Sequence, residues 1–379
     1  MSILSTIIVF IACHGGPADH FATFAESLST KGESVEIYAT GAALAKFEER
    51  KTPGVIPFSL DETESVKIAE QCEKADVVIT DLGHEFDISL QKNLKERAPK
   101  TLRYAYYDNP EPFVPGGYSS VAAQVIASTQ KVLFANAHLA NLPIYEREGK
   151  EIDLPFTQRV ALGFYPTMQA ERIAARRESK SDLRAQFFAE HRLQDRGEKI
   201  LLYLGGNNSV YFQEALPALL SCLMPHEEDL SNVIILFQQH PGAKLAGNRD
   251  VEQINAWEEV SSNRKKSRII ISQSSTETAL CLADCVAYYQ TSMGPAIVFS
   301  GIAPSCILQI GHRRYEDVLV NSGCATVVTT QKALVSAFEV MDQEMVRDDM
   351  GAFMALKNSL GMREDWQELL KQELINLSE

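Results

Sequence analysis

Short apolar runs alternate along the whole chain with longer segments whose apolar residues recur at helical spacing. In the first half, apolar runs predict buried strands at residues 7–12, 35–39, 77–80, 102–106 and 132–135. After the first run, a helical stripe is expected to end at Lys31-Gly32; it consists of Phe21, Phe24, Ala25 and Leu28. This alternation is typical of a parallel sheet with helices on both faces.

The same pattern restarts in the second half, with strands predicted at residues 200–204, 233–237, 269–271, 286–289 and 306–310. A glycine-rich turn and a helix follow the first of them, and the helix has the stripe Phe212, Leu216, Leu219, Leu220 and Leu223. Near the end of the chain, Trp366, Leu369, Leu370 and Leu374 predict a last helix. The chain therefore reads as two similar α/β domains with a closing helix.

The boundary between the domains is predicted from a change of texture after residues 162–166, where about thirty residues are rich in Arg, Glu, Lys and Ser. We predict an N-terminal Rossmann-like domain at 1–165, a linker region at 166–198, a C-terminal Rossmann-like domain at 199–358 and a C-terminal helix at 359–379. A length of 379 residues agrees with about two domains.

Composition excludes several classes of partner and compartment. A formal charge of −14 argues against a nucleic-acid partner, and the basic runs at 176–177 and 264–266 are expected on the solvated surface. Seven cysteines without a Cys-x-x-Cys pair disfavour a disulfide framework and a zinc site. The apolar run at residues 3–13 lacks a basic flank and a cleavage signal, and no run reaches membrane-spanning length. We expect a cytoplasmic protein without a transmembrane segment, of undetermined oligomeric state.

In open parallel sheets ligands bind beyond the carboxyl ends of the strands, so the turns there are the candidate sites. The first turn runs from Cys13 to His20 and enters a helix; Gly15 and Gly16 allow a ligand to approach the backbone. His20 is the candidate general base, because its unperturbed pKa is close to working pH. Asp81 and Asp108, each just past a predicted strand, are candidates to orient His20. The alternative is that Asp19 or His20 only caps the helix.

Two turns of the second half are candidate phosphate sites. Gly205, Gly206, Asn207 and Asn208 follow a strand without the Lys-Ser/Thr of a P-loop, which favours a diphosphate over a triphosphate, although an ordinary turn fits almost equally well. Thr291, Ser292, Met293 and Gly294 open a helix, where hydroxyl and N–H groups could bind phosphate or merely cap it. His240-Pro241 follows another strand and could reach a phosphate or a ribose.

The sequence contains neither a convincing Asp-x-Asp metal pair nor a Gly-x-Gly-x-x-Gly fingerprint, so a required metal or NAD is not expected.

Over nearly its whole length the chain resembles the GT-B glycosyltransferases, two facing Rossmann-like domains of which the first binds the acceptor and the second the sugar nucleotide. Residues 15–20 resemble the first turn of the N-acetylglucosaminyltransferase that forms lipid II, and residues 205–209 its second glycine-rich turn. Residues 283–286, Thr291-Ser292 and 301–304 resemble the family's donor region. The resemblance implies that the C-terminal helix packs back toward the first domain.

One departure bears on the donor. GT-B enzymes commonly have a ribose-binding Glu where this chain has Ala296, and His240-Pro241 also resembles a motif of GT-B sialyltransferases and UDP-N-acetylglucosamine 2-epimerases. The co-substrate expected from the resemblance is a UDP-sugar, with a CMP-sugar as the alternative.

The resulting hypothesis is an inverting glycosyltransferase in which His20 deprotonates an acceptor hydroxyl of unknown identity. Two alternatives stay open: a sugar-nucleotide epimerase or hydrolase on the same fold, and a non-catalytic sugar-nucleotide-binding protein.

Overall fold

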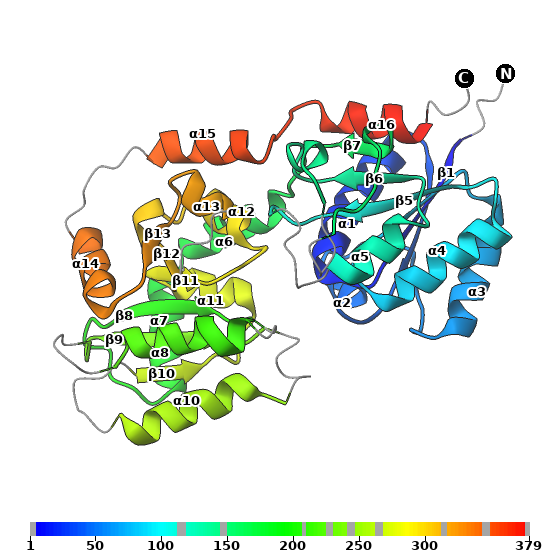
Figure 1. The fold of residues 1–379 in the computed structure, drawn as a ribbon. Helices are drawn as coiled ribbons and strands as arrows, with labels where there is room; N and C mark the ends of the chain where they lie inside the picture. Colours follow the sequence, from blue (N-terminus) through cyan, green and yellow to red (C-terminus); the bar gives the residue numbers. More distant parts are fainter. Residues whose placement is uncertain are drawn as a thin grey trace. The chain divides into compact units, whose positions relative to one another are not determined.

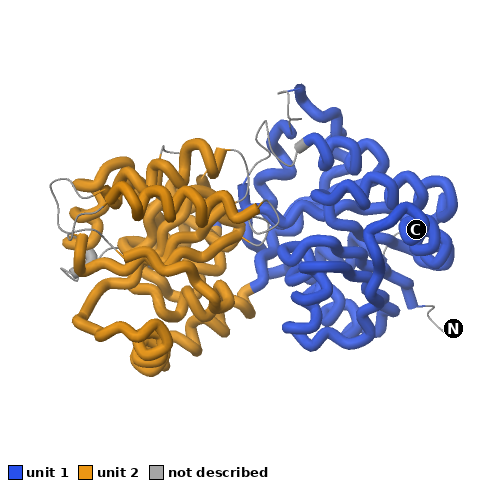
Figure 2. Tube along the Cα trace, turned by 90° about the horizontal axis from the view of Figure 1, so that it is seen from below, with its two compact units in different colours: residues 1–166, 358–379 blue, residues 167–357 orange. Residues whose placement is uncertain are grey.

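A computed structural model describes residues 5–111, 119–144, 150–206, 210–224, 230–240, 247–261, 268–311, 317–342 and 349–375. The chain forms two compact units (Figure 2): unit 1 holds residues 1–166 and 358–379, and unit 2 holds residues 167–357. Each unit contains one parallel sheet flanked by helices (Figure 1). The predicted α/β fold with two Rossmann-like domains is confirmed. No helix within the described ranges has both the length and the apolar character to cross a membrane.

The sheet of unit 1 has seven strands in the order β3-β2-β1-β4-β5-β6-β7, and all its pairs are parallel. Its strands are β1 (Ile7–Ala12), β2 (Ser34–Ala39), β3 (Val55–Pro57), β4 (Val77–Thr80), β5 (Leu102–Tyr107), β6 (Lys131–Phe134) and β7 (Arg159–Ala161). Its helices are α1 (Gly15–Thr30), α2 (Gly41–Glu49), α3 (Glu62–Gln71), α4 (Glu85–Arg97), α5 (Ser119–Ile126) and the last helix, α16 (Trp366–Ile375).

In unit 1 the apolar pattern missed two strands, and both are short strands at the edges of the sheet. The five predicted strands of unit 1 are present, and four of them, β1, β4, β5 and β6, are almost wholly buried. The strands β3 and β7 have only three residues each and lie at the two edges of the sheet, where little of the strand is buried. Runs this short carry no recognisable period of two.

The C-terminal helix α16 packs against unit 1, as predicted. Its Trp366 ring lies 4.2 Å from the ring of Phe164 and 5.7 Å from that of Phe24, measured between centroids. Leu370 and Leu374 are fully buried. A continuous apolar stripe thus joins the end of the chain to α1, and α16 is shorter than the predicted segment 359–379.

The sheet of unit 2 has six parallel strands in the order β10-β9-β8-β11-β12-β13. They are β8 (Lys199–Leu204), β9 (Val233–Gln238), β10 (Arg268–Ile271), β11 (Cys285–Tyr288), β12 (Ile307–Ile310) and β13 (Thr326–Val328). The helices are α6 (Met168–Arg177), α7 (Lys180–Glu190), α8 (Leu216–Cys222), α10 (Arg249–Val260), α11 (Thr276–Leu282), α12 (Gly294–Phe299), α13 (Val318–Asn321), α14 (Gln331–Asp342) and α15 (Asp349–Ser359). Again the unpredicted strand, β13, is a three-residue edge strand.

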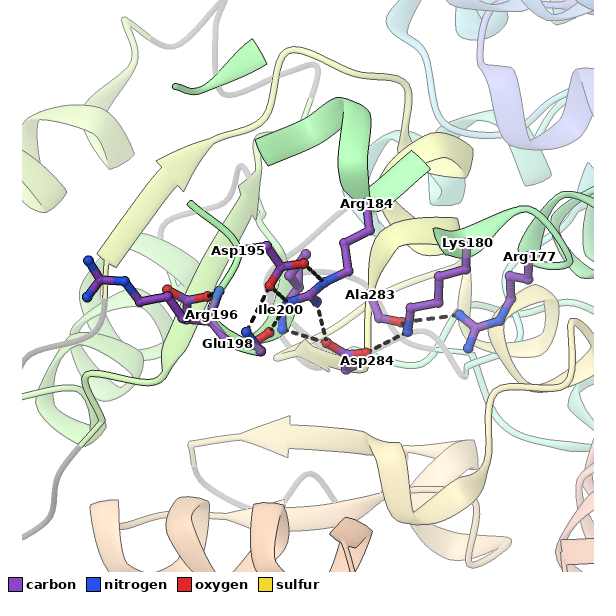
Figure 3. A network of polar contacts seen from close by, with 10 residues as sticks. Arg177, Lys180, Arg184, Asp195, Arg196, Glu198, Ile200, Ala283 and Asp284 are labelled. Atoms are coloured by element: carbon purple, nitrogen blue, oxygen red, sulfur yellow. Dashed lines mark hydrogen bonds and ion pairs between the residues drawn. The ribbon is translucent and has the colours of Figure 1, made fainter. Parts of the chain in front are cut away.

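Residues 166–198 were predicted as a linker, but residues 167–198 belong to unit 2 and include its helices α6 and α7 (Figure 1). Figure 3 shows the polar contacts of Arg177, Lys180 and Arg184 in this segment. Arg177 donates hydrogen bonds to the carbonyls of Leu280 and Ala283 at the carboxyl end of α11, where a helix carries partial negative charge. Lys180 binds the carbonyl of Ala283 at 2.9 Å and the carboxylate of Asp284 at 2.6 Å. Arg177, which was expected on the solvated surface, therefore anchors α6, and Lys180 anchors α7.

Asp284 has a counterpart in unit 1. Its Oδ2 atom accepts a 2.8 Å hydrogen bond from the N–H of Ile200 at the start of β8. In unit 1, Asp76 accepts a 2.8 Å hydrogen bond from the N–H of Ile7 at the start of β1. Each aspartate follows an alanine and precedes the strand that pairs with the first strand of its sheet. The Ala-Asp pair that resembled a donor-region motif thus fastens the amino ends of the central strands in both units.

Asp284→Ala should lower the free energy of unfolding of unit 2 by about 1–3 kcal/mol, because it removes the acceptor of Ile200 and a partner of Lys180. The sequence has two tryptophans, Trp257 in unit 2 and Trp366 in unit 1. In a Trp366→Phe background, urea titration followed by tryptophan fluorescence therefore reports on unit 2. Asp182→Ala, at an exposed position of α7, is the control; equal midpoints for the two variants would contradict the assignment.

Candidate functional site

In each sheet the strand order reverses beside the first strand, between β1 and β4 in unit 1 and between β8 and β11 in unit 2. Helices that follow the two strands of such a pair run to opposite faces of the sheet, which leaves a crevice at the carboxyl ends. In unit 1 this position is formed by the residues just after β1, β4 and β5. These residues include His14, Asp81 and Asp108.

Asp81 joins the ends of β1 and β4. Its Oδ2 atom accepts hydrogen bonds from the backbone N–H of Cys13 at 2.9 Å and of His14 at 2.8 Å, and it lies 3.1 Å from Nδ1 of the His14 ring. The Asp81 side chain is fully buried, whereas that of His14 is 42% exposed. The accessible imidazole of His14 is therefore held by the buried carboxylate of Asp81.

The interaction between Asp81 and His14 favours a negative charge on Asp81 and a positive charge on His14. Burial alone would raise the pKa of Asp81, but the hydrogen bond and charge of His14, the neighbouring Asp87 and the N–H of Cys13 outweigh it, and the net pKa is lowered. Burial also acts to lower the pKa of His14, yet the hydrogen bond and the charge of Asp81 raise the net pKa above its usual value of 6.5. With Nδ1–H donated to Asp81, Nε2 of neutral His14 carries the lone pair.

Asp108 lies beside the first turn of α1. A Cβ atom on Gly16 would come within 2.3 Å of Oδ2 of Asp108, so a larger residue at 16 would displace that carboxyl group. Burial raises the pKa of Asp108 to about 6, with a further rise from Asp81 and a decrease from His14. Asp108 can thus be protonated or ionised near neutral pH. Gly16 makes room for this carboxyl group.

His84 and Asp87 complete the polar groups at the end of β4. His84 caps α4: its Nδ1 accepts from the N–H of Phe86 at 3.1 Å, and its own N–H donates to Asp87 at 3.0 Å. The His84 ring lies 5.7 Å from that of His14, and burial followed by the charge of His14 lowers the pKa of His84. The two rings therefore compete for a proton, and His14 is favoured by Asp81.

The structure does not bring His20 to Asp81 or Asp108. His20 is 6% exposed on the inner face of α1, where its Nδ1 lies 2.5 Å from the hydroxyl of Tyr106. The rings of Phe164 and Tyr165 pack against it. Burial lowers the pKa of His20 to about 4. His20 stands four positions before Phe24 and eight before Leu28, so helical spacing puts it on the same apolar stripe of α1.

His14 is the residue that sequence reasoning passed over. His14 belongs to the turn of residues 13–20, but the last histidine of that turn, His20, was predicted to be the base. The available signal is its position two residues after β1, directly at the reversal of strand order, whereas His20 lies six residues later, about 1.7 helical turns further along the chain.

The glycines of the turn after β8 are explained by packing. A Cβ atom on Gly206 would lie 2.8 Å from the Tyr211 ring, and one on Gly205 would lie 3.1 Å from the carbonyl oxygen of Gln238. Gly205 also donates its N–H to that carbonyl at 2.9 Å. The two glycines let Tyr211 cover the end of β8. Asn207, Asn208 and Pro241, which were also predicted to bind the donor, lie outside the described residues.

The turn after β11 is stabilised from within. The Thr291 hydroxyl accepts from the N–H of Met293 at 3.1 Å; because Met293 is itself the N-cap of α12, this bond stabilises the turn before the helix, and no described side chain caps α12. Ser292 is exposed. Gly294 packs against Leu319: a Cβ atom at position 294 would lie 3.0 Å from the Leu319 side chain, which is tighter than an ordinary contact. His240 is exposed just past β9. The described residues of this edge thus offer a polar rim, on which Ser292 and His240 are accessible.

Three side chains of types that can bind metal ions lie within 4.8 Å of one another in the described ranges: Cys13, Asp81 and Asp87. All three are buried. Because the Oδ2 atom of Asp81 already accepts from three donors and Oδ2 of Asp87 accepts from His84, hydrogen bonding accounts for the arrangement, and we assign no metal ligand.

No protein-family model matches the sequence, and no curated protein sequence is detectably similar to it. Solved structures do match. The UDP-GlcNAc 2-epimerase of Neisseria meningitidis, bound to UDP-GlcNAc, has a TM-score of 0.64 at 10% identity, over 98% of this chain and 100% of that one. The UDP-GlcNAc 2-epimerase of Methanocaldococcus jannaschii has a TM-score of 0.59 at 13% identity, over 93% and 98%.

A third match is the N-terminal domain of the Candida albicans trehalose-6-phosphate phosphatase, with a TM-score of 0.59 at 12% identity over 100% of this chain and 98% of that one. At such low identity these likenesses show the fold. The chain has the GT-B type of fold, with two Rossmann-like domains, as the resemblance implied. These likenesses do not show that it is a glycosyltransferase.

Buried neutral His20 should make unit 1 sensitive to acid. Between about pH 6.5 and pH 4 the unfolded chain binds a proton at this residue and the folded chain does not, so stability falls on acidification through this window, by roughly 3 kcal/mol. His20→Gln, which can still hydrogen-bond Tyr106, should reduce that slope. Urea unfolding of unit 1, followed by Trp366 fluorescence in a Trp257→Phe background, measures it; an undiminished slope would refute the burial argument.

Proposed function

We propose that the protein is an enzyme acting on a UDP-sugar, with His14 of unit 1 as its base and the carboxyl-edge turns of unit 2 as its nucleotide site. The observation that carries the proposal is a half-exposed imidazole 3.1 Å from a fully buried carboxylate at the reversal point of a Rossmann-like sheet. The similar structures from N. meningitidis and M. jannaschii are UDP-GlcNAc 2-epimerases, which supports a UDP-sugar as the substrate class.

The His14–Asp81 pair has the arrangement of a general base. Asp81 holds Nδ1 in its protonated form, so that Nε2 accepts a proton from the substrate. The resulting imidazolium is stabilised by the buried carboxylate. Such a base contributes about 10²–10⁴-fold to a proton-transfer step. Orientation and charge stabilisation both come from one side chain, Asp81.

Epimerisation is the leading reaction. It requires one group that removes a proton from a sugar carbon and a protonated group that returns one to the opposite face. We assign these two roles to His14 and Asp108, because both lie at the amino end of α1 and because the pKa of Asp108 is about 6. Glycosyl transfer is the second candidate, favoured by the His14–Asp81 pair alone, since deprotonating an acceptor hydroxyl needs only a base.

The nucleotide is proposed to bind at the carboxyl edge of the unit 2 sheet. Beside the turn at Gly205-Gly206, the exposed Ser292 and the exposed His240 offer hydroxyl and imidazole groups without a fixed cation. Neutral donors of this kind suit a diphosphate that brings its own charge. Thr291, Met293 and Gly294 act here by shaping the turn.

Purified protein offered UDP-GlcNAc, other UDP-sugars and CMP-sugars tests the reaction class. An epimerised sugar nucleotide without any acceptor supports the leading reaction, and nucleotide release that needs an acceptor supports transfer. Asp108→Asn separates the two further, because it should abolish epimerisation and leave transfer measurable. Thermal stabilisation by nucleotides without turnover of any of them would overturn the proposal of an enzyme.

His14→Gln should lower kcat by about 10²–10⁴-fold, because it removes the base. The shift in Tm on adding UDP should stay as in the wild-type protein, since His14 belongs to unit 1. His20→Gln is the matched control at the buried histidine of the same helix region and should keep most of the activity. The opposite result, loss of turnover in His20→Gln and retention in His14→Gln, would restore His20 as the base.

A further inference from the structure

Two buried carboxyl groups lie beneath His14. The side chains of Asp81 and Asp87 are both fully buried, and Cys13, at 7% exposure, lies beside them. The polar atoms of the three side chains are within 4.8 Å of one another. No lysine or arginine of the described chain forms an ion pair with either aspartate. Two negative charges at this distance without a cation between them are strongly unfavourable in a buried place.

The hydrogen bonds to the two aspartates are unequal. Oδ2 of Asp81 accepts from two backbone N–H groups and lies 3.1 Å from the His14 ring. Asp87 accepts one backbone hydrogen bond, from the N–H of His84 at 3.0 Å, and its Oδ1 lies 3.8 Å from the Cys13 thiol, a weak donor. Asp81 is therefore the better site for the negative charge, and Asp87 the better site for a proton.

One atom of the cluster lacks a donor. Oδ1 of Asp81 is buried and has no hydrogen-bond donor among the described residues if Asp87 is ionised. A buried carboxylate oxygen without a partner is costly, at about 1–3 kcal/mol or more. An oxygen of Asp81 and an oxygen of Asp87 lie within 4.8 Å of each other, so a proton on Asp87 could supply the missing donor.

We propose that Asp87 is a neutral carboxylic acid in the folded protein at neutral pH, that it donates its proton to Oδ1 of Asp81, and that it thereby acts as a positioning residue for the His14 base. This interaction is a hydrogen bond in which the proton stays on Asp87, so no covalent bond is formed or broken. Burial and the neighbouring Asp81 raise the pKa of Asp87 well above its usual value, in agreement with this assignment.

The proton on Asp87 sets the charge that His14 experiences. With Asp87 neutral, one negative charge of the buried pair faces the imidazole, and Asp81 is held by donors at both oxygens. The other titratable groups around the pair are Cys13, whose pKa burial raises, His84, whose pKa burial lowers, and Asp108. None of the three supplies a fixed positive charge. The positioning role of Asp87 rests on the proposed function of His14 as a base. The protonation state of Asp87 does not depend on that proposed function.

Asp87→Asn is the decisive variant, because its amide N–H₂ can donate to Asp81 while its oxygen still accepts from His84. If Asp87 is neutral, this substitution leaves the charge unchanged, and the pKa of His14, followed by NMR titration of the imidazole, should move by less than about 0.3 units. If Asp87 were ionised, the variant would remove a nearby negative charge, and the pKa of His14 would drop by about one unit or more, which would overturn the proposal. Asp81→Asn is the positive control and should lower the pKa of His14.

Infrared spectroscopy of the wild-type protein gives a second measurement that does not depend on the folding of a variant. The spectrum at pH 7 should contain a carbonyl band of a neutral carboxylic acid that is lost in Asp87→Asn and kept in Asp108→Asn, which separates it from any protonated Asp108. Absence of this band from the wild-type protein would overturn the proposal. So would a stoichiometric metal ion, found by elemental analysis and lost in Cys13→Ala, because it would need both carboxylates ionised.

Activity then separates this inference from the proposed function. Asp87→Asn should keep kcat and its pH profile within about twofold, whereas Asp87→Leu, which cannot donate, should lower kcat and change that profile. If no UDP-sugar is turned over by the wild-type protein, the proposed function fails, but the NMR and infrared results still decide the protonation of Asp87.

Discussion

The Asp81 carboxylate is the group on which the unit 1 site depends. One oxygen accepts the N–H groups of Cys13 and His14 and contacts the His14 ring, so that a single acceptor fixes the backbone after β1 and the side chain that acts there. Because Asp81 is fully buried, these bonds are not replaced by water. The cost of burying this charge is offset by three donors and, in our proposal, by a fourth from Asp87. The site is accordingly set by the end of β4 as much as by the turn after β1.

The two units repeat one way of fastening their central strands. At the amino edge, Asp76 and Asp284 each accept the N–H of a residue at the start of the first strand, at 2.8 Å in both units. At the carboxyl edge the units differ: unit 1 carries the ionisable groups, and unit 2 presents glycines and polar turns. A rigid parallel sheet separates the two edges. Residues that hold the fold together therefore lie at one end of each sheet, and residues that could do chemistry lie at the other.

The contrast between His14 and His20 illustrates how burial decides a role. Both histidines belong to the same turn-helix segment, and both were accessible to the same sequence argument. His20 lies among aromatic rings, where burial lowers its pKa to about 4 and keeps it neutral. His14 keeps 42% of its side-chain surface and gains a proton-stabilising partner. A general base needs access, a partner and a suitable pKa together.

The sequence by itself determined the fold class and ten of the thirteen strands, because buried parallel strands and amphipathic helices need long apolar patterns that local reading detects. The packing of α16 on unit 1 was implied by the resemblance to the GT-B enzymes and not by the apolar pattern. Three-residue edge strands lack such patterns. The sequence also marked Asp81 and Asp108 as residues past strand ends. Only the tertiary structure decided which histidine meets Asp81, that Gly16 makes room for Asp108, and that residues 167–198 belong to unit 2. These facts depend on contacts between residues far apart in the chain, such as the 67 positions between His14 and Asp81, which no local pattern encodes.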